Sequence, residues 1–97
     1  MADSQVTLPP VTIDPALALL EFSSSAAGVL AADAMVKKAP LDIVRAGTVQ
    51  PGRFLVLVGG PVAEVEEAQR AGLDAAPEVL TDHIFLPGVH PDVVRSL

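Results

Sequence analysis

Two extended segments separated by only a few residues place the strongest constraint on how this chain can fold. Residues 41–48, LDIVRAGT, and residues 53–58, RFLVLV, are rich in aliphatic side chains and flank a Gln-Pro-Gly turn. Proline presets φ in such a turn, and glycine supplies conformational freedom. Strands joined by so short a connection pair as an antiparallel hairpin. The second strand shows no alternation of polar and apolar residues, so we expect it to be covered on both faces.

The segments on either side of this hairpin each contribute a strand and a helix. The predicted elements are strands at 16–22 and 81–86, helices at 26–39 and 62–75, and a short final helix that Pro91 opens. The order β-α-β-β-α-β predicts an α+β, ferredoxin-like fold, with four antiparallel strands and both helices on one face. Residues 1–15 contain three prolines among polar residues and predict an extended N-terminal tail. Residues 16–97 then form a single domain.

The hydrophobic content is high for a chain of this size. Of the 97 residues 51% are hydrophobic, but only 3% are aromatic. A domain of this length buries roughly 60–65% of the surface that its unfolded chain exposes. The composition therefore supplies more apolar surface than one small core can cover, and we expect the excess to lie in a subunit interface.

Charge and composition exclude several classes of function. The net charge of −6, with Lys and Arg mostly isolated, excludes the basic stripe that nucleic-acid binding requires. The absence of cysteine excludes disulfides, thiolate catalysis and Cys-ligated zinc or iron–sulfur clusters. No apolar stretch reaches the roughly 20 residues of a membrane span. The first residues lack the basic start and apolar run of a secretory signal. We expect no membrane and no nucleic acid among the partners.

No set of residues predicts catalysis. Ser23, Ser24 and Ser25 precede the first predicted helix, where serines serve as N-caps, and nothing nearby resembles a nucleophile elbow. His83 and His90 are separated by six residues, which is not a recognised metal-ligand spacing. We therefore predict no catalytic residue, no metal and no cofactor, and the chain is not expected to be an enzyme.

Three runs of sequence carry a resemblance to a known family. ALALLEF, AADAMVKKAPLDIVRAG and PGRFLVLVGGPVAEVEEAQRAG resemble the bacterial microcompartment (BMC) shell domain, over residues 16–97. The resemblance implies a structural shell protein, found in the shell of a cytoplasmic microcompartment, that assembles as hexameric or pseudo-hexameric tiles with a central pore. Implied partners are copies of the chain, other shell proteins, a second BMC domain of a tandem protein, and small metabolites that cross the pore. The runs PGVHPDVV and VQPGRFLVLVGG are similar in style to the first domain of the tandem shell proteins of propanediol-utilisation compartments.

The resemblance also assigns site residues. In the family, the lysine of AADAMVK lies at the tile edge; here it is Lys37, and Asp33 on the same helix is expected to position that edge. Where most single-domain relatives have a Gly-Ser-Gly pore turn, this chain has Gln-Pro-Gly, and if Arg53 faces the pore, anionic metabolites should be favoured. The family's edge arginine is absent from PGVH, so that role is not transferred. The residues implied to line the pore are Val49, Gln50, Pro51, Gly52 and Arg53.

A second class of function remains open for the same predicted fold. A small-molecule-sensing regulatory domain with an ACT-like fold would act as a dimer. Such a domain would bind its ligand at the turn after the first strand, which is FSSSAAG here. A ring of subunits would support the shell protein, whereas a dimer would support the sensor.

Overall fold

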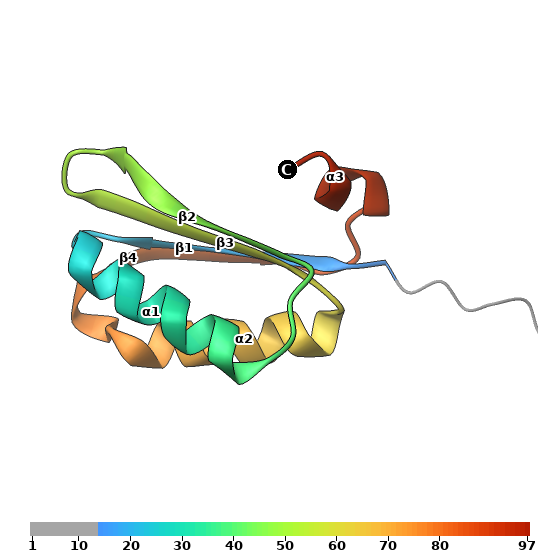
Figure 1. Ribbon diagram of the computed structural model, residues 1–97, viewed down its shortest axis with the longest axis horizontal. Coiled ribbons are helices and arrows are strands. Elements are labelled where there is room, and N and C mark those ends of the chain that lie inside the picture. The colour runs from blue at the N-terminus through green and yellow to red at the C-terminus, as the bar shows by residue number, and fades with distance from the viewer. Residues whose placement is uncertain (1–13) are drawn as a thin grey trace, which may run out of the picture.

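The computed structural model describes residues 14–97 and has the predicted α+β architecture, a four-stranded antiparallel sheet with helices (Figure 1). Its strand order is β2-β3-β1-β4, so β2 and β4 are the edges of the sheet. Most of the predicted N-terminal tail, residues 1–13, lies outside the described residues. The elements are β1 (Ala16–Phe22), α1 (Ser25–Lys38), β2 (Ile43–Gln50), β3 (Arg53–Gly60), α2 (Val62–Ala75), the 3-10 turn η1 (Pro77–Val79), β4 (Leu80–Leu86) and α3 (Pro91–Arg95).

The largest differences from the predicted boundaries are in the central hairpin. Strand β2 begins two residues later than predicted, at Ile43, and continues to Gln50, while β3 continues through Gly60. An irregularity in the pairing of β2 with β3 lies between Thr48 and Gln50, where Val49 has no partner in β3. Such a bulge adds one residue to one strand of a pair, and periodicity alone gives no sign of it. The hairpin is therefore longer than predicted, with a shorter turn.

The core lies between one face of the sheet and helices α1 and α2, which lie side by side on that face (Figure 1). The register of β1 and β3 places Leu20 opposite Val56, and Phe22 opposite Phe54. Residues directly opposite each other in an antiparallel pair point to the same face. This is the buried face of both strands, completed by Met35 of α1 and by Val65 and Ala68 of α2.

The opposite face of the sheet is only partly covered. Leu55 and Leu57 of β3 point there and are half-buried, so among residues 14–97 β3 is covered fully on one face only. The short helix α3 lies on this side of the sheet (Figure 1). Arg45 Nη2 donates to the carbonyl of Leu97 at 2.6 Å, which holds the segment after α3 near β2. The second cover expected for β3 is therefore absent from the part of the chain that the structure describes.

We expect Gly28→Val to destabilise the fold, because Phe54 packs directly against the backbone of α1 at Gly28. A Cβ atom at Gly28 would lie 2.2 Å from Cδ1 of the buried Phe54 ring. Overpacking of this kind costs about 1–3 kcal/mol. The urea concentration at the midpoint of unfolding should therefore be lower for Gly28→Val than for the unmodified protein. Gly47→Val is the matched control, since a Cβ atom there meets nothing within 4 Å. Equal midpoints for the two variants would contradict the packing described.

Candidate functional site

The turn between β2 and β3 stands at the end of the hairpin, at the opposite end of the sheet from α3 (Figure 1). It consists of Pro51 and Gly52, and Gly52 has φ of +76°. This left-handed conformation is one that glycine adopts without steric cost. The two residues are exposed. The turn predicted by the sequence is therefore present, and it projects from the end of the sheet.

The residues that flank this turn were predicted to belong to the loop, but two of them do not. Val49 and Gln50 are strand residues at the end of β2, and Gln50 is paired with Arg53. Val49 occupies the bulge and leaves 58% of its surface exposed. A bulge re-aims side chains near the end of a strand. The predicted pore segment is thus a two-residue turn between a bulged strand end and the first residue of β3.

Arg53 is anchored rather than free. Its Nη1 atom lies 2.6 Å from Oε2 of Glu21 in β1, and its side chain is 54% exposed. Glu21 is only 20% exposed, which makes it the most enclosed carboxylate among the ion pairs of residues 14–97. No pattern in the sequence predicts this partner, because the contact depends on the register between β1 and β3.

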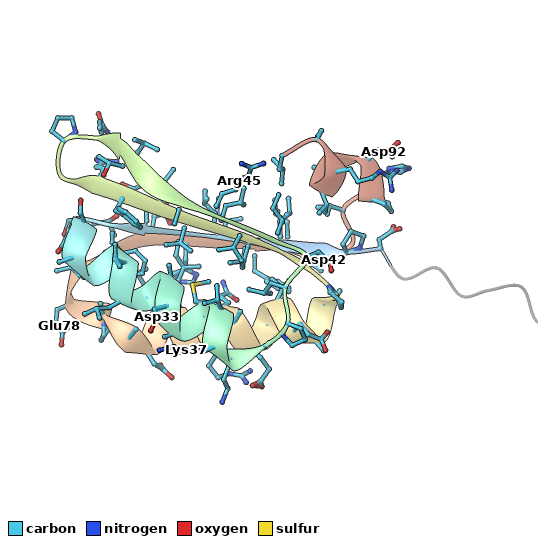
Figure 2. The ribbon with its side chains drawn as sticks, in the orientation of Figure 1. Asp33, Lys37, Asp42, Arg45, Glu78 and Asp92 are labelled. Carbon is cyan, nitrogen blue, oxygen red and sulfur yellow. The ribbon has the colours of Figure 1, made fainter. Side chains whose placement is uncertain are left out.

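Helix α1 presents an outer face opposite to the one it buries. Gly28, Ala31 and Met35 are buried against the sheet and α2. The outer face of α1 consists of residues that share the opposite side at helical spacing. On it, Leu30 is 65% exposed, and Asp33 lies 2.8 Å from Lys37 in an ion pair four residues apart (Figure 2). The members of this outer face are Val29, Leu30, Asp33, Val36 and Lys37.

The structure therefore brings together both predicted tile-edge residues, in the order Asp then Lys. An exposed pair of this kind contributes only a few tenths of a kcal/mol to the fold. The neighbouring Lys38 points elsewhere, with its Nζ 4.0 Å from Glu67 of α2. Among residues 14–97, only one side of α1 is covered. The exposed valines and leucine remain available for a neighbour.

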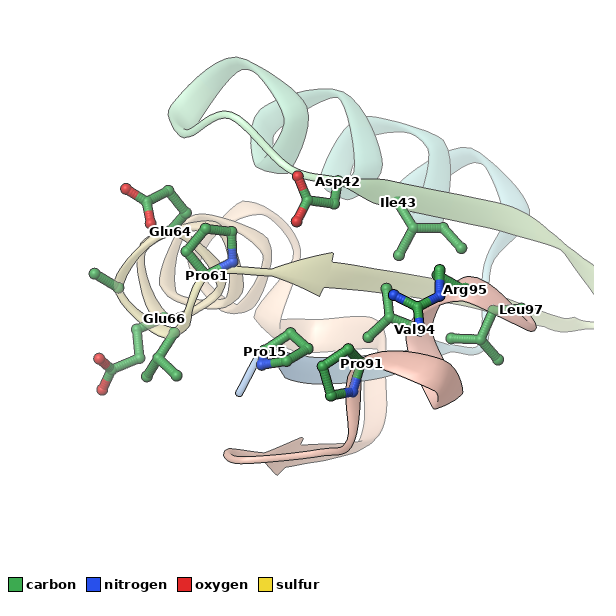
Figure 3. A pocket seen from close by; sticks show the side chains of 12 residues that line it. Pro15, Asp42, Ile43, Pro61, Glu64, Glu66, Pro91, Val94, Arg95 and Leu97 are labelled. Atoms are coloured by element: carbon green, nitrogen blue, oxygen red, sulfur yellow. The ribbon is translucent and has the colours of Figure 1, made fainter. Parts of the chain in front are cut away.

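A groove that the sequence analysis did not predict lies between the start of α2, the start of β2 and α3 (Figure 3). It encloses about 1080 Å³. Its walls are mainly apolar, and three carboxylates lie among them. Its lining residues come from four separate parts of the chain, so no local pattern could reveal it. They include Pro15, Ile43, Pro61, Pro91, Val94 and Leu97, with Asp42, Glu64 and Glu66 as the carboxylates.

Three of the residues considered for chemistry have structural partners for their side chains. Ser24 is the N-cap of α1 and accepts a hydrogen bond from the Ala27 amide at 3.2 Å. Ser23 donates through its hydroxyl to the Val79 carbonyl at 3.4 Å. His90 caps α3, its Nδ1 accepting from the Asp92 amide at 3.1 Å. Within residues 14–97, no three His, Asp or Glu side chains gather where they could hold a metal ion.

None of the helices between residues 14 and 97 combines the length and apolar character needed to span a bilayer.

Comparison with known proteins identifies the class to which this fold belongs. The family model described as BMC domain matches residues 16–89. The bacterial microcompartment shell protein PduT of Citrobacter freundii is 37% identical over 82 residues, covering 84% of this chain and 45% of PduT. The carboxysome shell protein CcmK3 of Synechococcus elongatus is 42% identical over 69 residues, covering 67% of this chain and 68% of the relative.

A solved structure agrees with these relatives. A microcompartment protein from Desulfitobacterium hafniense DCB superposes with a TM-score of 0.78 and 41% identity, covering 82% of this chain and 44% of that one. The chain belongs to the BMC domain family. It spans less than half the length of PduT and of the solved protein.

Proposed function

We propose that this protein is a structural subunit of a bacterial microcompartment shell in the cytoplasm and has no catalytic activity. The observation that carries the proposal is membership of the BMC domain family, whose relatives here are named as shell proteins. The domain we assign to this role is residues 16–97. Exposed apolar residues on α1 and the half-covered face of the sheet support a role in which the chain is surrounded by neighbours.

The subunits would close into hexameric or pseudo-hexameric rings with a central pore. The turn at Pro51 and Gly52, flanked by Val49, Gln50 and Arg53, would line that pore. The position of the turn supports this assignment, since the turn lies at the end of the sheet and is exposed (Figure 1). Pro51 brings no backbone N–H to the rim, whereas Gln50 supplies a side-chain amide.

Rings would then tile through the outer face of α1. Asp33 and Lys37 form one compact, exposed ion pair, with Val29, Leu30 and Val36 beside it. Burying a Val or Leu side chain fully is worth roughly 1.5–3 kcal/mol, so these three residues could drive a contact that the charges orient. The proposed partners are copies of this chain, other shell proteins and, in a tandem arrangement, a second BMC domain.

The alternative, an ACT-like sensor dimer, loses its proposed ligand turn. Ser23 and Ser24 in that turn are used for a contact to Val79 and for the cap of α1. Nothing in the turn favours a ligand over these local roles.

Native mass spectrometry and electron microscopy of the purified protein test the proposed function. We expect hexamers of the 10.0 kDa chain, and rings with a central hole that merge into flat sheets at higher concentration. A protein that stays monomeric or dimeric, with no rings in the micrographs, would contradict the shell role.

A further inference from the structure

One row of charged residues crosses three strands close to the hairpin turn, on the face of the sheet opposite to α1 and α2. Arg53 of β3 is bound to Glu21 of β1 at 2.6 Å. Glu21 lies opposite Asp82 of β4 in the register, so the two carboxylates share a face. Asp82 in turn accepts a hydrogen bond from the backbone amide of His83 at 2.8 Å. The order across the sheet is therefore a cation followed by two anions.

Glu21 is placed more firmly than a typical surface carboxylate. Its strand is central in the sheet, paired with β3 on one side and β4 on the other. Its carbonyl accepts a hydrogen bond from Thr81 Oγ1 at 3.1 Å. Only 20% of its side chain is exposed, so the pair with Arg53 is less screened by solvent than a fully exposed pair. Glu21 therefore fixes where the Arg53 guanidinium lies.

The pair also decides how much charge the turn carries. Among residues 49–53 only Arg53 is charged. Its guanidinium is separated from the Glu21 carboxylate by far less than the Debye length of roughly 8 Å at physiological salt. Seen from farther away, the two charges largely cancel. Asp82 lies two strands from β3, roughly 10 Å away at ordinary strand spacing, and is mostly screened.

Ring closure would concentrate these groups. If the hairpin turns meet at a common axis, every subunit brings one Arg53 to the same region. Unpaired cations gathered there would repel one another and attract anions, since a cleft lined by one sign of charge raises the local concentration of counter-ions by about tenfold or more. The Glu21 carboxylates prevent both effects.

We propose that Glu21 is a positioning residue of the pore, which neutralises Arg53 and so makes the rim suited to small uncharged polar solutes rather than to anions. This inference rests on the proposed ring and pore. It replaces the expectation that Arg53, if it faces the pore, favours anionic metabolites, because that expectation did not include the Glu21 carboxylate.

Ion selectivity of purified rings in a planar lipid bilayer tests the inference, with chloride and potassium as the probes. Under a KCl gradient, the reversal potential of the unmodified rings should indicate little preference for chloride. Glu21→Gln keeps a hydrogen-bond acceptor but removes the charge, and should raise the chloride-to-potassium permeability ratio about tenfold. Arg53→Gln should shift the ratio in the opposite direction. Glu64→Gln removes a carboxylate at the start of α2 and should leave it unchanged.

The double variant Glu21→Arg with Arg53→Glu restores the pair with reversed order and should return the ratio close to that of the unmodified rings. The inference would be overturned if Glu21→Gln left the chloride-to-potassium permeability ratio unchanged. It would also be overturned if the unmodified rings were already selective for chloride. Rings that pass no current, or a protein that forms no rings, would instead contradict the proposed function.

A second measurement does not need a pore. Phenylglyoxal modifies arginine side chains, and peptide mapping separates Arg53 from the other arginines. In Glu21→Ala the modification of Arg53 should become several-fold faster, while that of Arg70, which is bound to Glu67 within α2, should not change. An unchanged rate at Arg53 would show that Glu21 does not hold it in solution, and the inference would fail even if rings form.

Discussion

Lys37→Asp is expected to leave rings intact while abolishing the flat sheets that they form. The substitution puts a second carboxylate four residues from Asp33, where the structure has an ion pair at 2.8 Å. Within the helix, a like-charge pair at this spacing costs only about 0.2–0.5 kcal/mol. The chain should therefore fold normally, and contacts within each ring should persist.

The effect between rings should be far larger. In a contact that is the same on both sides, each ring presents the outer face of α1 to a copy of itself. The substitution replaces two attractive pairs by four carboxylates, and like charges brought together across an interface cost several kcal/mol. Electron micrographs should show dispersed rings at concentrations where the unmodified protein forms sheets, and native mass spectra should show the hexamer in both.

Lys38→Asp is the matched control, because it makes the same charge change one residue along the helix. The Lys38 side chain points to Glu67 of its own chain, with 4.0 Å between Nζ and Oε2. Its sheets should resemble those of the unmodified protein. If the two variants lose sheets to the same degree, net charge and not the Lys37 contact governs tiling. If Lys37→Asp still forms normal sheets, the edge role is wrong.

Much of the fold could be predicted from local sequence. Ser24 caps the start of α1 and Pro40 follows its end, so both limits of that helix are encoded within a few residues. The Gln-Pro-Gly segment gave the hairpin, and the hairpin with two flanking helices left only a few possible topologies. The predicted bounds of β2 and β3 were wrong by a few residues. The bulge at Val49 lengthens the hairpin that these strands form. Pairing between strands, not the pattern within one, decides such an irregularity.

The candidate site was predicted only in part, because some of its contacts join neighbouring residues of one helix and others join residues far apart in the sequence. Asp33 and Lys37 are four residues apart on one helix, so their ion pair follows from helical geometry alone. Glu21 and Arg53 are 32 residues apart and meet only because β1 lies next to β3 in the sheet. No spacing in the sequence carries that information. The resemblance to the family placed Arg53 beside a pore, but it said nothing of what Arg53 would bind.

Phe22→Ala should have the largest effect on folding. Phe22 is fully buried and is the largest such side chain in the described residues. It lies opposite Phe54 in the register of β1 and β3, on the face that α1 and α2 cover. Truncating a buried Phe to Ala costs about 3–5 kcal/mol. Domains of this size are stable by only about 5–15 kcal/mol in total, so the variant should be marginally folded or unfolded as a monomer.

Urea unfolding followed by circular dichroism measures this loss, in dilute solution so that assembly does not mask it. Phe85→Ala is the control, since it removes the same ring from β4 at the edge of the sheet, where Phe85 is only half-buried. Its midpoint should fall much less, because solvent already reaches that ring and neighbours can relax into the space. If the two variants lose equal stability, the core does not centre on β1 and β3. The same comparison bears on assembly, because a subunit that cannot hold β1 against β3 also cannot hold Glu21 next to Arg53.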